Sequence, residues 1–310
     1  MRKVIIGWLS LVISFYSSGG YAERASLIVD IQTNQVLYAH NANLPAYPAS
    51  LTKLMTVYLI FEAIENQKLS LTDQFIASKT AQAQIGSRLG LREGDVITVK
   101  ELVLALIVRS ANDAAIVAAE ALASTEAEFV RQMNFRTRVL GMKDTVFKNA
   151  SGLPDPEQVT TARDLAVLAV AIQKRYPRHF HLFSVKTFSY KNRDYKTHNH
   201  FTNNYAGAHG LKTGFTCNAG YNLVTLVRRN KQQLIGVVLG EESSKQRDIL
   251  MASLMDKALE KSMKVDKNLT LDRLRYQQQY GAGGNANLTA IAISCGSKSF
   301  IRKPVLASSS

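Results

Sequence analysis

Pro48-Ala49-Ser50-Leu51-Thr52-Lys53 contains the only Ser-x-x-Lys sequence of this chain of 310 residues. A serine hydroxyl is a weak nucleophile near neutral pH and needs a base within hydrogen-bonding distance. Residues three apart lie on one face of a helix, so a helix that begins near Ser50 places Lys53 beside the serine. The apolar run from Leu54 to Ile64 would bury this helix, and burial lowers the pKa of a lysine. Ser-x-x-Lys also arises by chance in a chain of this length, so its function depends on other residues.

Residues 1–22 have the form of a secretory signal peptide. Arg2 and Lys3 give a positive start, residues 4–16 are apolar, and Gly20-Tyr21-Ala22 supplies the small residues that a signal peptidase recognises. The apolar part is too short for a comfortable transmembrane helix. We therefore expect cleavage after the last residue of this segment and export to the periplasm, with association with the inner membrane left open.

The composition is that of a folded globular protein, with 46% apolar and 20% charged residues. The length allows one large domain or two modest ones, with a sizeable core. The formal net charge of +14 suits peripheral contact with an anionic membrane surface or cell wall. Nucleic-acid binding needs clustered basic and aromatic patterns, and an exported protein has little access to nucleic acid, so we do not predict it.

Short apolar runs indicate strands towards both ends of the chain, and longer apolar segments indicate helices between them. This order predicts an α/β fold of the α+β type, in which an antiparallel sheet built from both chain ends lies beside a helical lobe. Capping-box sequences begin at Thr98 and Thr125. The expected strands are 26–30, 35–38, 183–190, 221–229 and 234–240, and the expected helices are 50–66, 98–109, 114–123, 125–141, 161–176 and 244–262.

The chain is therefore expected to divide into a signal peptide at 1–22, a folded domain at 23–262 and a tail at 263–310. The tail is polar and basic, and its 281–285 segment is rich in glycine, as in a linker. We expect this tail to be poorly ordered.

Cys217 and Cys295 are the only cysteines of the chain. An oxidising compartment permits a disulfide between them, but their spacing cannot establish one. Because a free cysteine is usually a small buried hydrophobe, we expect Cys217 to be packed rather than reactive. His198-Asn199-His200 and His209 could suggest zinc, yet polar residues in a loop explain them better. Neither a metal nor a cofactor is predicted.

Two further motifs can complete the serine and lysine pair. Ser110-Ala111-Asn112 lies between two expected helices, where a loop can present both side chains. Lys212-Thr213-Gly214 lies just before an expected strand. A nucleophile on a helix, a hydroxyl and an amide on a loop, and a cation at a strand edge can converge where a helical lobe meets a sheet.

Ser-x-x-Lys, Ser-x-Asn and Lys-Thr-Gly in this order are the signature of penicillin-binding proteins and serine β-lactamases. Over about residues 24–262, the chain most closely resembles the low-molecular-mass penicillin-binding proteins, the serine-type D-alanyl-D-alanine carboxypeptidases of peptidoglycan metabolism. The likeness extends to residues 109–115, 149–154, 160–166 and 210–216. It implies a fold like that of β-lactamases and transpeptidases.

The resemblance implies catalytic roles for the first two motifs. Ser50 would form an acyl-enzyme with a peptidoglycan stem peptide ending in D-alanyl-D-alanine, with Lys53 as the base. Ser110 would pass a proton to the leaving amine, and Asn112 would hold the lysine and the substrate amide. Water would then release the shortened peptide, and β-lactam antibiotics would acylate the same serine as inhibitors.

The third motif implies the substrate-binding residues. Lys212, Thr213 and Gly214 would bind the substrate at its free carboxylate, through charge-assisted hydrogen bonds from the lysine and the hydroxyl. The backbone amides of Ser50 and Phe215 would form the oxyanion hole.

Some features differ from the patterns of related enzymes and leave alternatives open. His209 stands where many family members carry an aspartate, and a neutral histidine would not pair with Lys212 as a carboxylate would. A class A β-lactamase holds its deacylating water with a glutamate in a Glu-x-x-Leu-Asn segment. None of the glutamates between the second motif and Thr160 has that context: Glu120, Glu126, Glu128 and Glu157.

We therefore favour a carboxypeptidase over a lactamase. A non-catalytic penicillin-binding or cell-wall-binding protein is the third alternative, and nothing supports it because all the catalytic residue types are present. The balance between carboxypeptidase and endopeptidase activity depends on the shape of the cleft and is left open.

Overall fold

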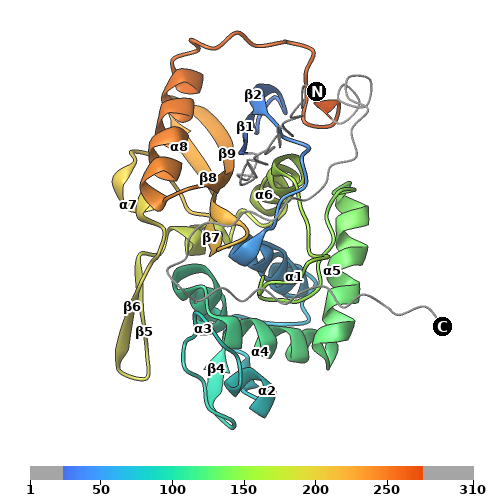
Figure 1. The fold of residues 1–310 in the computed structure, drawn as a ribbon. Helices are drawn as coiled ribbons and strands as arrows, with labels where there is room; N and C mark the ends of the chain where they lie inside the picture. Colours follow the sequence, from blue (N-terminus) through green and yellow to red (C-terminus); the bar gives the residue numbers. More distant parts are fainter. Residues whose placement is uncertain (1–23, 275–310) are drawn as a thin grey trace, which may run out of the picture.

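The computed structural model describes residues 24–274 (Figure 1). The predicted signal peptide and the tail beyond residue 274 lie outside the described residues. Between these limits the chain forms an antiparallel sheet and a helical lobe, which is the predicted α+β arrangement.

Five antiparallel strands in the order β2-β1-β9-β8-β7 form the main sheet. The N-terminal hairpin pairs with the C-terminal strands through β1 and β9, so both chain ends build the sheet as predicted. β1, β8 and β9 are apolar on both sides, because helices cover both faces of the sheet (Figure 1). The strands are β1 (Ala25–Asp30), β2 (Val36–His40), β7 (Lys212–Thr216), β8 (Gly220–Arg229) and β9 (Gln232–Glu241).

Helices α6 (Ala162–Arg175) and α8 (Ser244–Leu259) cover the two faces of the sheet. The close approach of α8 depends on Gly236 in β9, where a Cβ atom would lie 2.4 Å from the Met255 side chain and 2.5 Å from that of Met251. Residues of β8 and β9 form one hydrophobic core with α8, and α1 (Lys53–Glu65) lies in the larger core between sheet and helical lobe.

The helical lobe follows α1 in the chain. Its helices are α2 (Lys79–Gln82), α3 (Val99–Leu104), α4 (Asn112–Ala123) and α5 (Glu126–Leu140), and a small sheet joins β3 (Gln74–Ile76) to β4 (Val96–Thr98). A hairpin of β5 (Thr187–Tyr190) and β6 (Arg193–Lys196) reaches along this lobe (Figure 1), and the short α7 (His200–Asn204) leads back to the sheet.

Local sequence signals fix several helix ends. Thr98 forms the predicted capping box, since its hydroxyl accepts from the Glu101 amide while the Glu101 carboxylate accepts from the Thr98 amide. Thr125 caps α5 through the amide of Glu128, but the Glu128 carboxylate pairs with Arg131 instead of returning to Thr125. The second capping box is therefore only half formed, because a nearby cation competes for its carboxylate.

Three features of the fold differ from the expectations. The strand expected at 183–190 is a 3-10 helix (Phe180–Ser184) followed by the shorter β5, since Phe180 and Phe183 pack into the core from a helical turn. Strand β7 was not expected: the third motif was placed ahead of the strand at 221–229, but Lys212–Thr216 forms a strand of its own, which pairs with that expected strand, β8. Residues 269–274 pack onto the N-terminal hairpin, since the Leu271 amide donates to the Asn34 carbonyl oxygen and both Leu271 and Leu274 are buried in the core.

Candidate active site

Ser50 lies in a 3-10 turn, Ala49–Thr52, that leads directly into α1. The loop at Gly152 holds this turn closely: a Cβ atom at Gly152 would lie 1.9 Å from the Ala49 carbonyl oxygen. Gly152 also has a φ of +85°, which disfavours any side chain. From the other side, a Cβ atom at Gly214 would lie 2.9 Å from the Pro48 carbonyl oxygen. Glycines on both sides therefore let the backbone close around the serine.

Lys53 is fully buried at the start of α1, and its amine contacts three oxygens. Nζ lies 3.1 Å from Ser50 Oγ, 2.7 Å from Asn112 Oδ1 and 2.5 Å from the Ser151 carbonyl oxygen. Burial lowers the pKa of Lys53 well below its ordinary value, and the nearby Lys212 lowers it further, while Asp113 opposes the shift. A lysine in this environment can accept a proton from the serine beside it.

The Ser110-Ala111-Asn112 motif lies where a π-helical turn (Ala105–Arg109) ends and α4 begins. Ser110 adopts a left-handed backbone with a φ of 61°, which breaks the helix and turns Asn112 towards Lys53. Asn112 Nδ2 donates to the Ile85 carbonyl oxygen at 2.6 Å, so the amide is held with its oxygen towards the lysine. Among the described residues, Ser110 Oγ makes no hydrogen bond to Ser50, Lys53 or Lys212.

Strand β7 is the edge strand beside the Ser50 turn. Lys212, Thr213 and Gly214 are buried at its start, and Phe215 is 41% exposed and stacks on Tyr221. Burial, together with a smaller effect of a nearby arginine, lowers the pKa of Lys212 to about 7. Its amine donates to the Thr213 carbonyl oxygen at 2.8 Å. The edge of β7 thus carries a cation and a hydroxyl next to the serine.

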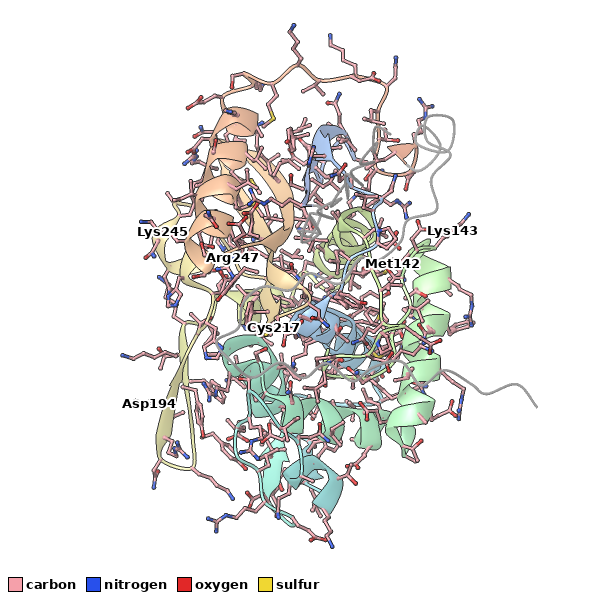
Figure 2. All side chains as sticks on the ribbon, viewed as in Figure 1. Met142, Lys143, Asp194, Cys217, Lys245 and Arg247 are labelled. Carbon is pink, nitrogen blue, oxygen red and sulfur yellow. The ribbon has the colours of Figure 1, made fainter. Side chains whose placement is uncertain are left out.

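The arginine beside Lys212 is Arg247, which sequence reasoning did not single out. Arg247 lies on the first turns of α8, at the end nearest β7 (Figure 2), and its guanidinium is buried. Arg247 Nε donates a hydrogen bond to Asp248 Oδ1 at 2.9 Å. No motif identifies this residue, because only the packing of α8 on the sheet brings it to Lys212.

The Ser151 carbonyl was also missed as a contact of Lys53, although residues 149–154 had been noted in the sequence. This loop is tied to α1, since Thr56 Oγ1 donates to the Ala150 carbonyl oxygen at 2.7 Å. The Asn149 side chain accepts from the Gly152 amide at 2.7 Å. The asparagine and the glycine thus shape a loop that presents a main-chain oxygen to the lysine.

His198, His209 and Cys217 lie in three different surroundings near the candidate site. His209 contacts Ser184, with 3.3 Å between Nδ1 and Oγ, and burial lowers its pKa. His198 lies against Arg109, with 3.1 Å between Nε2 and Nη1. The expectation of a packed free thiol at Cys217 was wrong, because Cys217 is exposed at the end of β7 (Figure 2) and disulfide-bonded. Cys295 lies outside the described residues.

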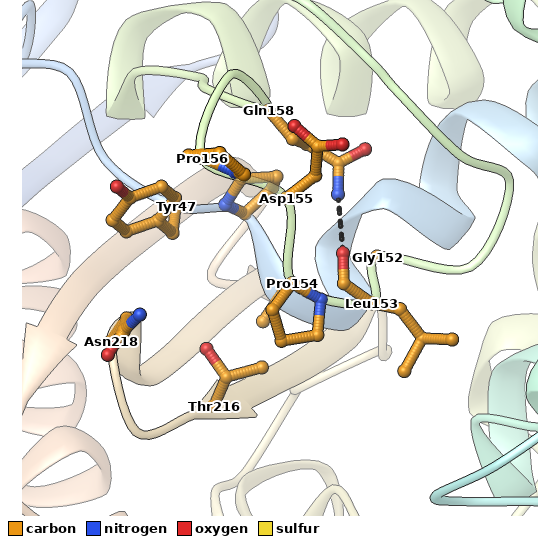
Figure 3. A pocket seen from close by; sticks show the side chains of 11 residues that line it. Tyr47, Gly152, Leu153, Pro154, Asp155, Pro156, Gln158, Thr216 and Asn218 are labelled. Atoms are coloured by element: carbon orange, nitrogen blue, oxygen red, sulfur yellow. Dashed lines mark hydrogen bonds between the residues drawn. The ribbon is translucent and has the colours of Figure 1, made fainter. Parts of the chain in front are cut away.

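A cavity of about 520 Å³ opens beside the serine turn (Figure 3). Tyr47, Pro48 and Ala49 form one side, the loop 152–158 forms a second, and Thr216 and Asn218 at the end of β7 form a third. It extends the site away from Lys212 along β7.

Residues 24–274 contain no group of three or more histidine, cysteine, aspartate or glutamate side chains that could hold a metal ion. Within the same residues, no helix is both long and apolar enough to span a bilayer.

Comparison with known proteins agrees with this geometry. A family model described as D-alanyl-D-alanine carboxypeptidase matches residues 18–243. The chain belongs to the D-alanyl-D-alanine carboxypeptidase family. It is 32% identical over 237 residues to the carboxypeptidase DacF of Bacillus subtilis, covering 75% of this chain and 61% of DacF. It is 36% identical over 272 residues to DacD of Escherichia coli, covering 80% and 69% of the two chains. The chain thus spans about three fifths to two thirds of the length of these relatives.

Solved structures of family members have the same fold. DacD from Francisella tularensis superposes with a TM-score of 0.74 at 27% identity, over 84% of this chain and 73% of that one. Penicillin-binding protein D2 of Listeria monocytogenes, in its ampicillin-bound form, gives a TM-score of 0.67 at 29% identity, over 76% and 96% of the two chains. The predicted fold class, that of DD-peptidases and transpeptidases, is confirmed.

Proposed function

We propose that this chain is a serine DD-carboxypeptidase that removes the terminal D-alanine from peptidoglycan stem peptides and is acylated by β-lactams. The single observation that carries the proposal is the Lys53 amine, buried and 3.1 Å from Ser50 Oγ. The family membership and the relatives named as D-alanyl-D-alanine carboxypeptidases support the same reaction. The ampicillin-bound structure of a relative supports β-lactam binding.

In the proposed acylation, Lys53 takes the proton of Ser50 while Oγ attacks the carbonyl carbon of the penultimate D-alanine. The C–N bond to the terminal D-alanine then breaks, and the amine leaves with the proton that Lys53 took, relayed through the Ser110 hydroxyl. The backbone amides of Ser50 and Phe215 stabilise the oxyanion, worth about 3–4 kcal/mol for a single donor. Water hydrolyses the ester and returns the proton to Ser50.

We propose that Lys212, Thr213 and Gly214 bind the substrate at its free carboxylate, and that Arg247 adds positive charge near Lys212. A peptide can lie along the free edge of β7 with its carboxylate at Lys212. Its preceding residues then extend towards Thr216 and the cavity of Figure 3. A site that requires a free carboxylate thereby selects the C-terminal end of a peptide.

A pH dependence follows from the two buried lysines. The proposed base Lys53 must be neutral and the proposed carboxylate receptor Lys212 must be protonated, so kcat/KM should follow a bell-shaped curve. The alkaline limb should fall near pH 7, because Lys212 loses its charge as the pH rises through its pKa of about 7. Steady-state rates between about pH 5 and 9 measure it. Lys212→Arg should remove the alkaline limb, since arginine stays charged; an unchanged limb in that variant would contradict the assignment.

The function is tested by mixing the purified protein with a peptide ending in D-alanyl-D-alanine and, separately, with penicillin. We expect release of D-alanine and a long-lived penicilloyl adduct on the Ser50 peptide by mass spectrometry. Penicillin hydrolysis at many turnovers per second would favour a β-lactamase. A stable adduct without D-alanine release would favour a non-catalytic penicillin-binding protein.

We also propose that residues 1–22 are a signal peptide, that a catalytic domain follows it, and that the protein acts in the periplasm. The positive start and apolar stretch of that segment support export. The net charge of +14 supports peripheral contact with the anionic wall or membrane surface. Labelled protein released by osmotic shock, with the first residue of the mature chain determined, tests both points.

A further inference from the structure

Asp113 follows the Ser110-Ala111-Asn112 motif and is almost completely buried, with 1% of its surface exposed. Its carboxylate accepts hydrogen bonds from three successive backbone amides across the lobe, those of Leu89 at 3.0 Å, Gly90 at 2.7 Å and Leu91 at 3.0 Å. A fourth bond comes from the Ala114 amide at 2.9 Å. A buried carboxylate with four amide donors is well satisfied and holds the segment that supplies them.

The segment it holds, residues 85–91, makes three contacts with the candidate catalytic motif. The Ile85 carbonyl oxygen accepts from Asn112 Nδ2 at 2.6 Å. The Ser87 carbonyl oxygen accepts from the Asn112 amide at 2.7 Å. Ser87 Oγ donates to the Arg109 carbonyl oxygen at 2.7 Å, just before the left-handed Ser110. We call residues 85–91 the clamp loop.

Together, these hydrogen bonds tie the clamp loop and the start of α4 to each other in both directions. Asn112 is fixed to the clamp loop through both its side chain and its main chain, and the clamp loop is fixed to α4 through the residue next to Asn112. An asparagine amide can rotate to present either its oxygen or its nitrogen. The bond to Ile85 selects the orientation in which Oδ1 accepts from Lys53.

We propose that Asp113 is a positioning residue for the reaction, which anchors the clamp loop and through it fixes the Asn112 amide against Lys53 and the backbone turn at Ser110. The inference rests on the proposed function, because it needs Lys53 and Asn112 to act in the chemistry. Asp113 touches neither substrate nor reacting atoms in this scheme. It acts through the loop and through its negative charge.

The negative charge of Asp113 also affects the pKa of Lys53, the proposed base. The charged groups that affect Lys53 are Lys212 on β7, which lowers its pKa, and Asp113 on α4, which raises it. Removing the carboxylate charge should therefore lower the pKa of Lys53 further. Since the neutral lysine is the proposed base, the acid limb of the acylation rate should move to lower pH.

Asp113→Asn tests the proposal in the full-length protein, with penicillin acylation followed by stopped-flow fluorescence or mass spectrometry between about pH 4 and 9. We expect the acylation rate constant to fall by about ten- to a hundredfold, because a small misplacement of a catalytic group has an effect of that size. The dissociation constant of the first complex should change little. The acid limb should move to lower pH, because the Asp113 charge that raises the pKa of Lys53 is lost.

Ser87→Ala is the matched control, since it removes one contact of the clamp loop without changing charge. Its acid limb should stay in place. The proposal is overturned if folded Asp113→Asn keeps the wild-type rate constant and acid limb. It is equally overturned if both variants lose rate alike with unshifted limbs, since Asp113 would then be merely structural.

Thermal unfolding shows whether Asp113→Asn is folded, and Gly86→Ala decides the matter if it is not. Gly86 has a φ of +76°, and a Cβ atom there would lie 3.1 Å from Asn112 Nδ2. This variant should lower the acylation rate constant with no shift of the acid limb, and an unchanged rate would overturn the proposal. Wild-type protein that penicillin does not acylate would instead refute the proposed function.

Discussion

Ser50→Ala is expected to abolish both D-alanine release and covalent capture of penicillin. The variant loses the only atom that can form the ester, so the loss in kcat should be at least about 10⁴-fold. The fold should persist, because among residues 24–274 Ser50 Oγ has one hydrogen bond, the one donated by Lys53, and that amine keeps two other acceptors. Mass spectrometry after incubation with penicillin, together with D-alanine release, provides the measurement.

Ser184→Ala is a suitable control for this experiment. It also removes a serine hydroxyl, but that hydroxyl contacts His209 and is not among the partners of Lys53. It should keep the penicillin adduct. An adduct of normal yield in Ser50→Ala, on any other residue, would show that the nucleophile is misassigned.

Lys53→Met should reduce the rate of acylation by about 10²- to 10⁴-fold, the range for loss of a general base. Methionine fills a similar volume but cannot accept the proton of Ser50. The variant leaves Asn112 Oδ1 and the Ser151 carbonyl oxygen without their donor, at a cost of about 1–3 kcal/mol each. The variant also removes an amine whose burial costs free energy, so the loss in the free energy of unfolding should be partly offset.

Lys53→Arg separates the role of base from that of a mere cation. Arginine retains the positive charge but cannot become neutral in this pH range. If acylation needs a neutral base, this variant should be as slow as Lys53→Met in the stopped-flow measurement. Acylation of either variant at the wild-type rate would exclude Lys53 as the base.

Local sequence patterns were sufficient for much of the fold. The apolar runs expected as strands at 26–30 and 35–38 are β1 and β2, and the helices expected at 125–141 and 161–176 end at Gly141 and begin at Thr161 in the structure too. The strand expected at 183–190 failed because its phenylalanines are equally suited to a buried helical turn. Periodicity is ambiguous in such short apolar runs, and only tertiary packing decides them.

Some groups of the candidate site were identified by sequence motifs, and others only by the structure. Ser50, Lys53 and Asn112 are linked by hydrogen bonds in the structure, and the sequence motifs had named all three. No sequence motif indicated that Arg247 would lie near Lys212. The Ser151 carbonyl could not be identified either, because every residue has a carbonyl and only the loop conformation turns this one towards the lysine.

By itself, the sequence determined which chemical groups are available: one serine with a lysine three residues later, and the order of the two motifs that follow. Those are properties of covalent spacing and residue type. Tertiary structure alone decided the environment of these groups. Burial of Lys53 and Lys212 in one site lowers both of their pKa values, and the desolvation that causes this exists only after the lobe and the sheet have packed together. The clamp loop and Asp113 depend on the same packing, since their bonds join residues more than twenty positions apart.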